Sequence, residues 1–276
     1  MKQIVSTNWV FKNINKKRLL IFDCSWHLPS ENINASKYFL KCHINKSLFF
    51  DIDKISNQKS QFPHMAPKQN FFENKVRNLG VNSDSIIVVY DTIGIYSSPR
   101  VWWLFKYFGH DKVFVMDGGL KKWIKEKKPI TKKIINPKKG NFKGKLNKSL
   151  KVNYKFILKN ILNKNITILD ARSSERFFGI VKEPRKELNS GHIPKSINLF
   201  WKNLISTNGT ILSKTKIIKI LKKYKLNNKK IITTCGSGVT ACILSLALLH
   251  NNNIKSALYD GSWCEWGFKK NLPIEK

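Results

Sequence analysis

The sequence predicts an α/β protein with two tandem domains, each a mainly parallel sheet flanked by helices. The first observation is the length of 276 residues, since a domain usually has about 100–200 residues. The second is an internal repeat, because the same short patterns occur in the same order in both halves. The third is the alternation of short β-branched runs with longer helical patterns, as parallel strands joined by crossover helices require.

Four pairs of matching segments make up the repeat. Each half has an apolar run ending in Asp, then a His-Ile-x-Lys-Ser segment, then a β-branched run, and finally an Asp-Gly segment followed by a Trp. Four matches in one order, at similar spacing, indicate a duplicated domain rather than chance. The pairs are 19–23 with 167–170, 43–47 with 192–196, 86–91 with 230–235, and 117–123 with 260–266.

Strands are expected where apolar or β-branched residues run without interruption, because parallel strands are buried on both faces. Helices are expected at 101–108 and 239–250, following two of these strands. The second helix is almost wholly apolar and therefore buried, and the residues from Asn251 to Asn253 end it. The expected strands are 86–90, 113–116, 166–169 and 231–234.

The stretch from Thr131 to Lys151 separates the two repeats. It is rich in Lys, Asn, Gly and Pro and has little periodicity, which is typical of a linker. We therefore expect an N-terminal domain over 1–133, a linker over 134–152 and a C-terminal domain over 153–276.

Composition excludes several classes of protein. Hydrophobic residues make up 42%, too many for a disordered chain, and no apolar run reaches the roughly 18 residues of a membrane span. The N-terminus lacks the apolar core of a signal peptide, so we expect a cytoplasmic protein without membrane contact. The five cysteines are scattered and contain no CxxC pair, which argues against a disulfide framework and against a structural zinc site.

The formal net charge of +34 allows two interpretations. A strongly basic chain can bind the phosphates of nucleic acid. However, lysine far outnumbers arginine, and Lys, Asn and Ile are abundant throughout the chain, as an A/T-rich coding sequence would produce. We favour compositional drift and expect no specific nucleic-acid partner, while non-specific association stays open.

Cys235 is the candidate nucleophile, in a loop between a predicted strand and the apolar helix. Ligands of open α/β sheets bind at the carboxyl ends of strands. Gly236 and Gly238 let the backbone curl so that successive N–H groups point inward, and the helix N-terminus adds partial positive charge. A thiol placed there ionises more readily, and the thiolate is the nucleophile. Cys242, inside the helix, is expected to be a packing residue.

The segment Cys-Gly-Ser-Gly-Val-Thr at 235–240 resembles the active-site loop of the 3-mercaptopyruvate sulfurtransferases, which are two-domain members of the rhodanese family. The likeness extends over about residues 8–267 and includes 98–103, 191–194 and 260–263. It implies two tandem rhodanese-like domains, of which only the second is catalytic, and Asp91 occupies the matching position of the first. It also implies that Cys235 carries sulfur as a persulfide, with the substrate surrounded by Gly236, Gly238, Val239 and Thr240.

Two related groups of enzymes differ in this loop. Protein tyrosine phosphatases and their relatives need an arginine that closes the loop on phosphate, whereas position 241 is Ala here. Thiosulfate-preferring rhodaneses carry cationic side chains in the loop, where this chain has Gly236 and Ser237. The uncharged loop favours a monoanionic donor such as 3-mercaptopyruvate.

Arginines near the start of the second half are candidate ligands of the donor. Arg binds carboxylates through paired donors, and its use in a lysine-dominated chain indicates that this geometry matters. The resemblance implies that Arg176 and Arg185 hold the carboxylate and keto groups of the donor, while Arg172 occupies a structural position beside an acid. Exposed loop arginines without a role are the alternative.

The resemblance further implies a proton relay of Asp53, His64 and Ser237. A histidine whose pKa is near neutral, and whose tautomer a carboxylate fixes, suits such a relay. Ser237 has the alternative role of shaping the loop through hydrogen bonds.

Together these features imply a sulfurtransferase that moves sulfur from 3-mercaptopyruvate to a small thiol, to reduced thioredoxin or to cyanide, with release of pyruvate. No metal and no organic cofactor are expected. A thiosulfate:cyanide sulfurtransferase is the nearest alternative, and a non-catalytic, basic interaction module of the same fold is a second one.

Overall fold

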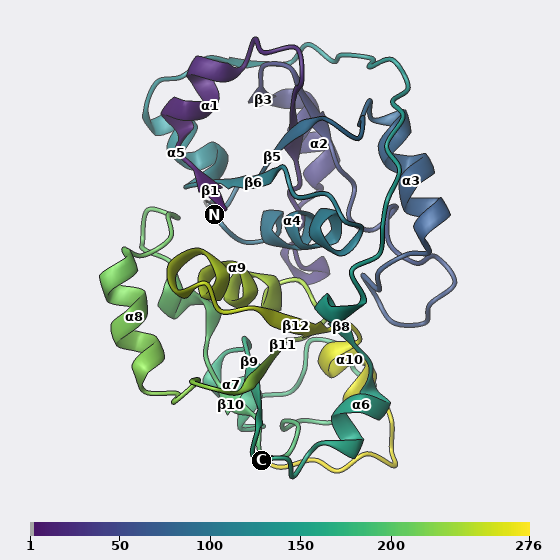
Figure 1. Cartoon of the computed structure of the whole chain (residues 1–276), viewed down its shortest axis with the longest axis vertical. Coiled ribbons are helices and arrows are strands. Elements are labelled where there is room, and N and C mark those ends of the chain that lie inside the picture. The colour runs from purple at the N-terminus through teal and green to yellow at the C-terminus, as the bar shows by residue number, and fades with distance from the viewer. Residues whose placement is uncertain (1–2) are drawn as a thin grey trace. The chain divides into compact units, whose positions relative to one another are not determined.

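The computed structural model describes residues 3–276 (Figure 1). By its internal contacts the chain divides into two compact units. Unit 1 contains the described residues up to Gln58 together with Ala66–Asn147 and Thr207–Ile211, and unit 2 contains Lys59–Met65, Lys148–Ser206 and Leu212–Lys276. Each unit therefore includes a short segment from the other half of the sequence, while the expected domain limits themselves stay a prediction.

Unit 1 is built on a five-stranded parallel sheet in the order β1-β6-β5-β2-β4. The expected strands at 86–90 and 113–116 are confirmed as β5 and β6, which are buried on both faces because helices cover both. The strands are β1 (Ile4–Val5), β2 (Leu19–Asp23), β4 (Ser47–Phe49), β5 (Ile86–Tyr90) and β6 (Val113–Met116). A separate antiparallel pair consists of β3 (His43–Ile44) and β7 (Ile130–Thr131).

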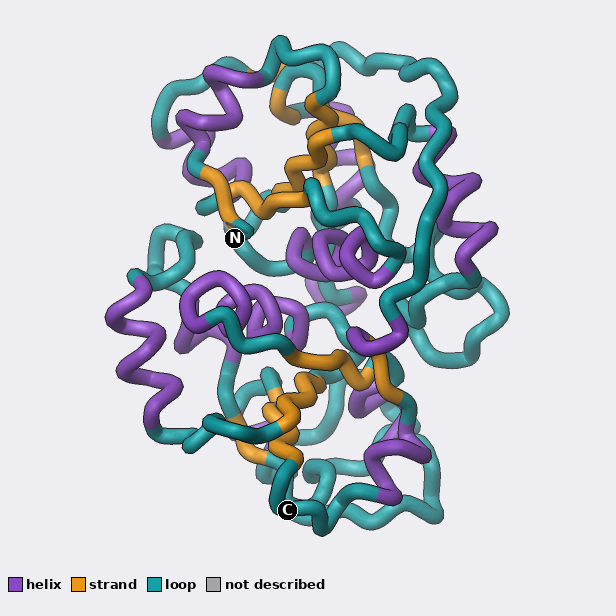
Figure 2. Tube along the Cα trace, in the orientation of Figure 1, coloured by secondary structure: helices purple, strands orange, loops and turns teal. Residues whose placement is uncertain are grey.

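The helices of unit 1 pack on both faces of this sheet, as Figure 2 shows in purple around the orange strands. Val88 and Tyr90 face α1 and α5 in one core cluster that includes Val10 and Trp123. On the opposite face, Phe72 of α3 packs edge to face against Phe105 of α4 and stacks on Phe108, the residue that follows α4. The helices are α1 (Thr7–Asn13), α2 (Ala35–Lys41), α3 (Gln69–Asn78), α4 (Ser98–Tyr107) and α5 (Gly119–Lys125).

The helix expected at 101–108 is confirmed as α4, although α4 begins earlier, at Ser98. Pro99 explains the earlier start, because proline fits the first turn of a helix, where its missing N–H costs no hydrogen bond.

Much of the expected linker belongs to unit 1, which includes residues up to Asn147. Phe142 is buried, and its N–H donates to the Val81 carbonyl at 3.0 Å. The N–H of Gly140 donates to the Arg77 carbonyl at 2.8 Å. These bonds hold the segment along α3, and unit 2 resumes at Lys148.

Unit 2 repeats the parallel sheet of unit 1, in the order β10-β9-β11-β12-β8. The expected strands at 166–169 and 231–234 are confirmed as β9 and β11. The repeat in the sequence is thus a repeat of topology, because β9 and β11 lie where β2 and β5 lie in unit 1. The strands are β8 (Lys151–Val152), β9 (Ile166–Asp170), β10 (Ile197–Asn198), β11 (Lys230–Thr234) and β12 (Ser256–Tyr259).

Helices also cover both faces of the second sheet. The helix expected at 239–250 is confirmed as α9, which begins at Ala241, ends at Asn252 and is capped by Asn253 in the left-handed region, with φ of 53°. Its side chains are buried nearly all round, as the apolar sequence predicted. The described helices include none long and apolar enough to cross a membrane. The helices are α6 (Tyr154–Lys159), α7 (Ser174–Phe177), α8 (Lys214–Lys222), α9 (Ala241–Asn252) and α10 (Ser262–Trp266).

Candidate active site

The register of the second sheet brings two loops together at its carboxyl end. Asp170 of β9 pairs with Thr234 of β11, and the N–H of Ala171 donates to the Thr234 carbonyl at 2.9 Å. The chain after β9 carries Arg172, and the chain after β11 carries Cys235. These residues therefore leave the sheet side by side, at the end where open α/β sheets bind ligands.

The first turn of α10 holds the Cys235 loop in place. The N–H of Cys235 donates to the Ser262 hydroxyl at 3.2 Å. The carbonyls of Cys235 and Gly236 accept from the N–H groups of Trp263 and Cys264 at 2.9 and 2.8 Å. Cys235 itself is 1% exposed. The thiol therefore sits at the end of the central strand on a backbone that hydrogen bonds fix at three consecutive points.

Two further residues of the loop behave differently from Cys235. Gly238 has a φ of 76°, a conformation that favours glycine and turns the chain into α9. Cys242 is fully buried in α9, where its Sγ lies 3.3 Å from the Gly238 carbonyl. This is the packing role that the sequence predicted for Cys242.

The loop of unit 1 that matches the Cys235 loop holds a carboxylate, that of Asp91. The Asp91 carboxylate accepts from the N–H groups of five residues and from the Ser98 hydroxyl, at 2.7 to 3.1 Å. A loop at this position of the fold thus surrounds an anion with amides, which is the property that we predicted for the loop at Cys235. The amide donors come from Ile93, Gly94, Tyr96, Ser97 and Ser98.

Arg176 lies directly against the Cys235 loop. A Cβ atom at Gly236 would be 3.1 Å from Nη2 of Arg176, so glycine leaves room for the guanidinium. Arg176 donates from Nε and Nη2 to the two carboxylate oxygens of Glu183 at 3.2 and 2.5 Å. Its side chain keeps 23% of its surface exposed, so Arg176 is not closed off from solvent as Glu183 is.

Glu183 is a residue of the candidate site to which the sequence analysis assigned no role. Its carboxylate is buried and also accepts from Nη1 of Arg172 at 3.0 Å. Arg172 is buried too, bonds Asp170 through Nη2 at 2.7 Å, and stacks over the Trp263 ring at 4.3 Å. Glu183 therefore links the structural arginine to Arg176. The acid beside the Pro-Arg pair at 184–185 was visible in the sequence, but the second arginine contact depends on tertiary structure.

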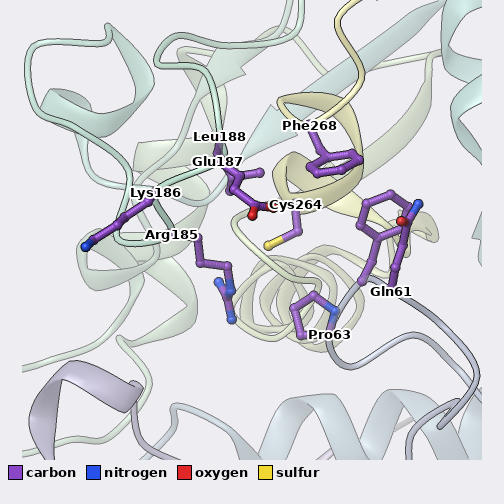
Figure 3. Close-up of a pocket in the computed structure, with 9 residues that line it drawn as sticks. Gln61, Pro63, Arg185, Lys186, Glu187, Leu188, Cys264 and Phe268 are labelled. Atoms are coloured by element: carbon purple, nitrogen blue, oxygen red, sulfur yellow. The ribbon is translucent and has the colours of Figure 1, made fainter.

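Arg185 lines a pocket of about 310 Å³ in unit 2 (Figure 3). Among the described residues no hydrogen bond or ion pair holds its guanidinium. Cys264 also lines this pocket, although the sequence offered no reason to place it there. The remaining lining residues are Gln61, Phe62, Pro63, Lys186, Glu187, Leu188 and Phe268.

Electrostatics connect this pocket with the Cys235 loop. Burial raises the pKa of the Cys264 thiol to about 11, and the nearby Cys235 raises it too. The charges of Arg185 and Arg176 act in the opposite direction. Both arginines thus make the electrostatic potential at Cys264 more positive, and Cys264 lies near the candidate nucleophile.

His64 contacts the loop from the segment Lys59–Met65, which belongs to unit 2. Its Nδ1 lies 2.9 Å from the Ser237 hydroxyl, and both side chains are buried. His64 has a φ of 60°, so the backbone is held in the left-handed region where few residues other than glycine occur. Asp53 belongs to unit 1, and its part in a relay stays a prediction.

Comparisons with known proteins agree with this architecture. The model of the rhodanese-like domain matches residues 6–126 and 156–269. The 3-mercaptopyruvate sulfurtransferase of Mus musculus is 35% identical over 272 residues, covering 96% of this chain and 92% of that protein. The thiosulfate sulfurtransferase of Rattus norvegicus is 35% identical over 280 residues, covering 99% and 94%.

A solved structure matches both units as well. SseA from Escherichia coli, a 3-mercaptopyruvate sulfotransferase, superposes with a TM-score of 0.87 at 32% identity, covering 95% of this chain and 99% of that one. Two family matches in tandem and relatives that cover nearly the whole chain lead to one conclusion. The chain belongs to the rhodanese family and is a two-domain sulfurtransferase.

Proposed function

We propose that this chain takes sulfur from 3-mercaptopyruvate onto Cys235 and passes it from the resulting persulfide to a thiol or cyanide. One observation carries the proposal: the guanidinium of Arg176 lies against the loop of the candidate nucleophile, and the Arg176 side chain is partly exposed. A donor with a carboxylate two carbons from its sulfur fits a thiolate and a guanidinium that are close together.

In the first half-reaction the Cys235 thiolate attacks the donor sulfur. A sulfur–sulfur bond forms, the carbon–sulfur bond breaks, and the electron pair leaves with pyruvate as its enolate. Arg176 and Arg185 hold the carboxylate and keto oxygen, which orients the sulfur and stabilises the enolate charge. The donor's thiol proton then converts the enolate to pyruvate, so Cys235 is left as a persulfide anion.

The proton transfer is assigned to Ser237 and His64, whose 2.9 Å contact gives a path between the loop and an imidazole. Asp53 would fix the tautomer of His64 in this proposal. In the second half-reaction a small thiol, reduced thioredoxin or cyanide attacks the outer sulfur, and Cys235 leaves as the thiolate. Chemistry of this kind uses only side chains and the two substrates.

Loop charge is the reason for choosing 3-mercaptopyruvate over thiosulfate. Relatives that act on either donor are equally similar to this chain, so identity does not decide. Thiosulfate is a compact dianion whose second charge lies close to the transferred sulfur. Gly236 and Ser237 add no cation to that of Arg176 beside the loop, so the second charge would be desolvated with too few partners, which is costly.

Steady-state kinetics with both donors test this choice. At fixed ionic strength we expect a higher kcat/KM for 3-mercaptopyruvate than for thiosulfate. Gly236→Arg with Ser237→Lys should raise the thiosulfate value and lower the other. Gly236→Gln is the control, because it adds bulk at the same place beside Arg176 without adding charge. A wild type that prefers thiosulfate, or a donor ratio that the charged variant leaves unchanged, would contradict the proposal.

The arginine pair gives a second prediction. Arg176→Ala and Arg185→Ala each remove a charge-assisted bond to the donor carboxylate, which is worth about 1.5–3 kcal/mol. Persulfide formation should slow by roughly ten- to a hundredfold, while discharge to cyanide, which has no carboxylate, should change little. Stopped-flow measurement separates the two half-reactions. Equal losses in both would mean that the arginines do not form a donor site.

A further inference from the structure

The outer side of α8 in unit 2 is covered with lysine. α8 buries Ile217 and Leu221 and packs beside α9 (Figure 1). Its lysines are exposed, and the turn between α8 and β11 adds further exposed lysines. The lysines of this helix side and this turn, which we call the α8 face, are Lys216, Lys219, Lys222, Lys223, Lys225 and Lys229.

The protein supplies no negative charge to the α8 face. Residues 188–259 contain no aspartate and no glutamate, although the rest of the chain contains 17 of them. Within the described residues 3–276, no lysine of the α8 face forms an ion pair. Compositional drift can enrich lysine throughout a chain, but it gives no reason for acids to be missing from one continuous stretch. The charge of the α8 face is therefore available to an anionic partner.

The same arrangement lowers the stability of α8 itself. Side chains three or four residues apart on a helix are neighbours, and like charges there repel one another. Lys219 has Lys216 on one side and both Lys222 and Lys223 on the other. Lys216 also lies in the first turn, which contains no acid, and the positive end of the helix dipole disfavours a cation there. A bound polyanion would remove both penalties, because it brings the negative charge that the helix lacks.

The surroundings of the α8 face do not suit a lipid surface. Helices that bind membranes insert exposed apolar side chains beside their cations. Among the described residues from 198 to 267, no large hydrophobic side chain is exposed. An anionic membrane would therefore meet the lysines without any apolar anchor beside them.

The chemistry of the α8 face also argues against contact with bases. Proteins that bind single strands stack the bases on exposed aromatic rings, whereas Tyr224 is half-buried and donates its hydroxyl to the Asn198 carbonyl at 3.2 Å. Base edges in a duplex are read most often by the paired donors of arginine, and residues 188–259 contain no arginine. Lysine contacts phosphate as a point charge, which carries no information about sequence.

We propose that the α8 face binds the phosphate backbone of double-stranded nucleic acid without reading its sequence. The proposal does not depend on the sulfur chemistry. Lys229 lies just before β11 and Cys235 just after it, so the nucleic acid would bind at the opposite end of this strand from the sulfur carrier. DNA and RNA duplexes share the phosphate chemistry, and the experiment compares the two.

Fluorescence anisotropy with a labelled DNA duplex, and with the RNA duplex of the same sequence, tests the proposal over a series of salt concentrations. Lys219→Gln with Lys223→Gln should weaken binding to all sequences alike. The slope of log affinity against log salt should fall in magnitude by about two, since each lost phosphate contact contributes about 0.9. The midpoint of thermal unfolding should not fall, because the substitutions relieve repulsion between like charges.

Lys37→Gln with Lys41→Gln is the matched control, because these exposed lysines of α2 in unit 1 are also four residues apart and their removal changes the net charge equally. The control should leave the slope unchanged. Equal losses in the two double variants would mean that binding follows net charge alone, and the inference would be overturned. Wild type that binds neither duplex at low salt, or an α8 variant that loses only its binding to phosphatidylserine vesicles, would overturn it as well. A lower unfolding midpoint in the α8 variant would show that these lysines serve the fold instead.

Discussion

We expect that replacing Cys235 by serine abolishes sulfur transfer and leaves both units folded. A serine hydroxyl is not ionised near neutral pH and is a far weaker nucleophile than a thiolate. The fold should survive because the contacts that hold this position come from the backbone: its N–H bonds Ser262 and its carbonyl bonds Trp263. Wild type treated with donor should gain about 32 Da, removable by reductant, as sulfur uptake on one thiolate requires. The variant should gain nothing.

Cys264→Ala is the control for this experiment. Cys264 is the second buried thiol near the loop, and burial keeps its pKa at about 11, so it stays protonated at neutral pH. The Cys264 variant should therefore still take up sulfur on Cys235. If sulfur uptake followed Cys264, or persisted in Cys235→Ser, the nucleophile would be misassigned.

The fold was predictable because its signals are local. A strand buried on both faces must be apolar along its whole length, so β5, β6, β9 and β11 could be located from composition alone. The duplication supplied the topology, because a segment matched in order must occupy a matched place. Helix limits were less certain. Pro99 moved the start of α4, and the glycine-rich loop delayed the start of α9.

The candidate site was predictable only in part, because its contacts join distant segments. Cys235 could be proposed as the nucleophile from its neighbours, since a glycine-flanked cysteine at a strand end has few structural explanations. Glu183 could not, because its bonds to two arginines depend on how the segment folds over α7. The contact between His64 and Ser237 joins residues far apart in the sequence, and nothing local in 59–65 indicates that it belongs to unit 2.

Arg172 should contribute more to the stability of unit 2 than any exposed charge of the protein. Its guanidinium bonds Asp170, Glu183 and the Gly191 carbonyl and stacks on Trp263, all within the core. Arg172→Ala would leave the buried Asp170 carboxylate without its cation and would leave Glu183 with Arg176 alone. Breaking a buried ion pair in this way typically costs about 3–5 kcal/mol, because the remaining charge stays desolvated. Arg172→Lys should recover only part of this loss, since an ammonium cannot bond two carboxylates in the planar geometry of a guanidinium.

Native-state hydrogen exchange resolves this prediction, because a two-unit chain need not unfold in one step. In Arg172→Ala the amides of β9 and β11 should lose protection by more than about a hundredfold, the equivalent of about 3 kcal/mol. The amides of β5 in unit 1 serve as an internal reference and should keep theirs. Arg18→Ala is the control for a salt bridge in solvent, because Arg18 lies 3.1 Å from Asp84 with its side chain 70% exposed, and its removal should cost at most about 1 kcal/mol. Unchanged protection of β9 in Arg172→Ala would show that the network positions Arg176 without stabilising the fold.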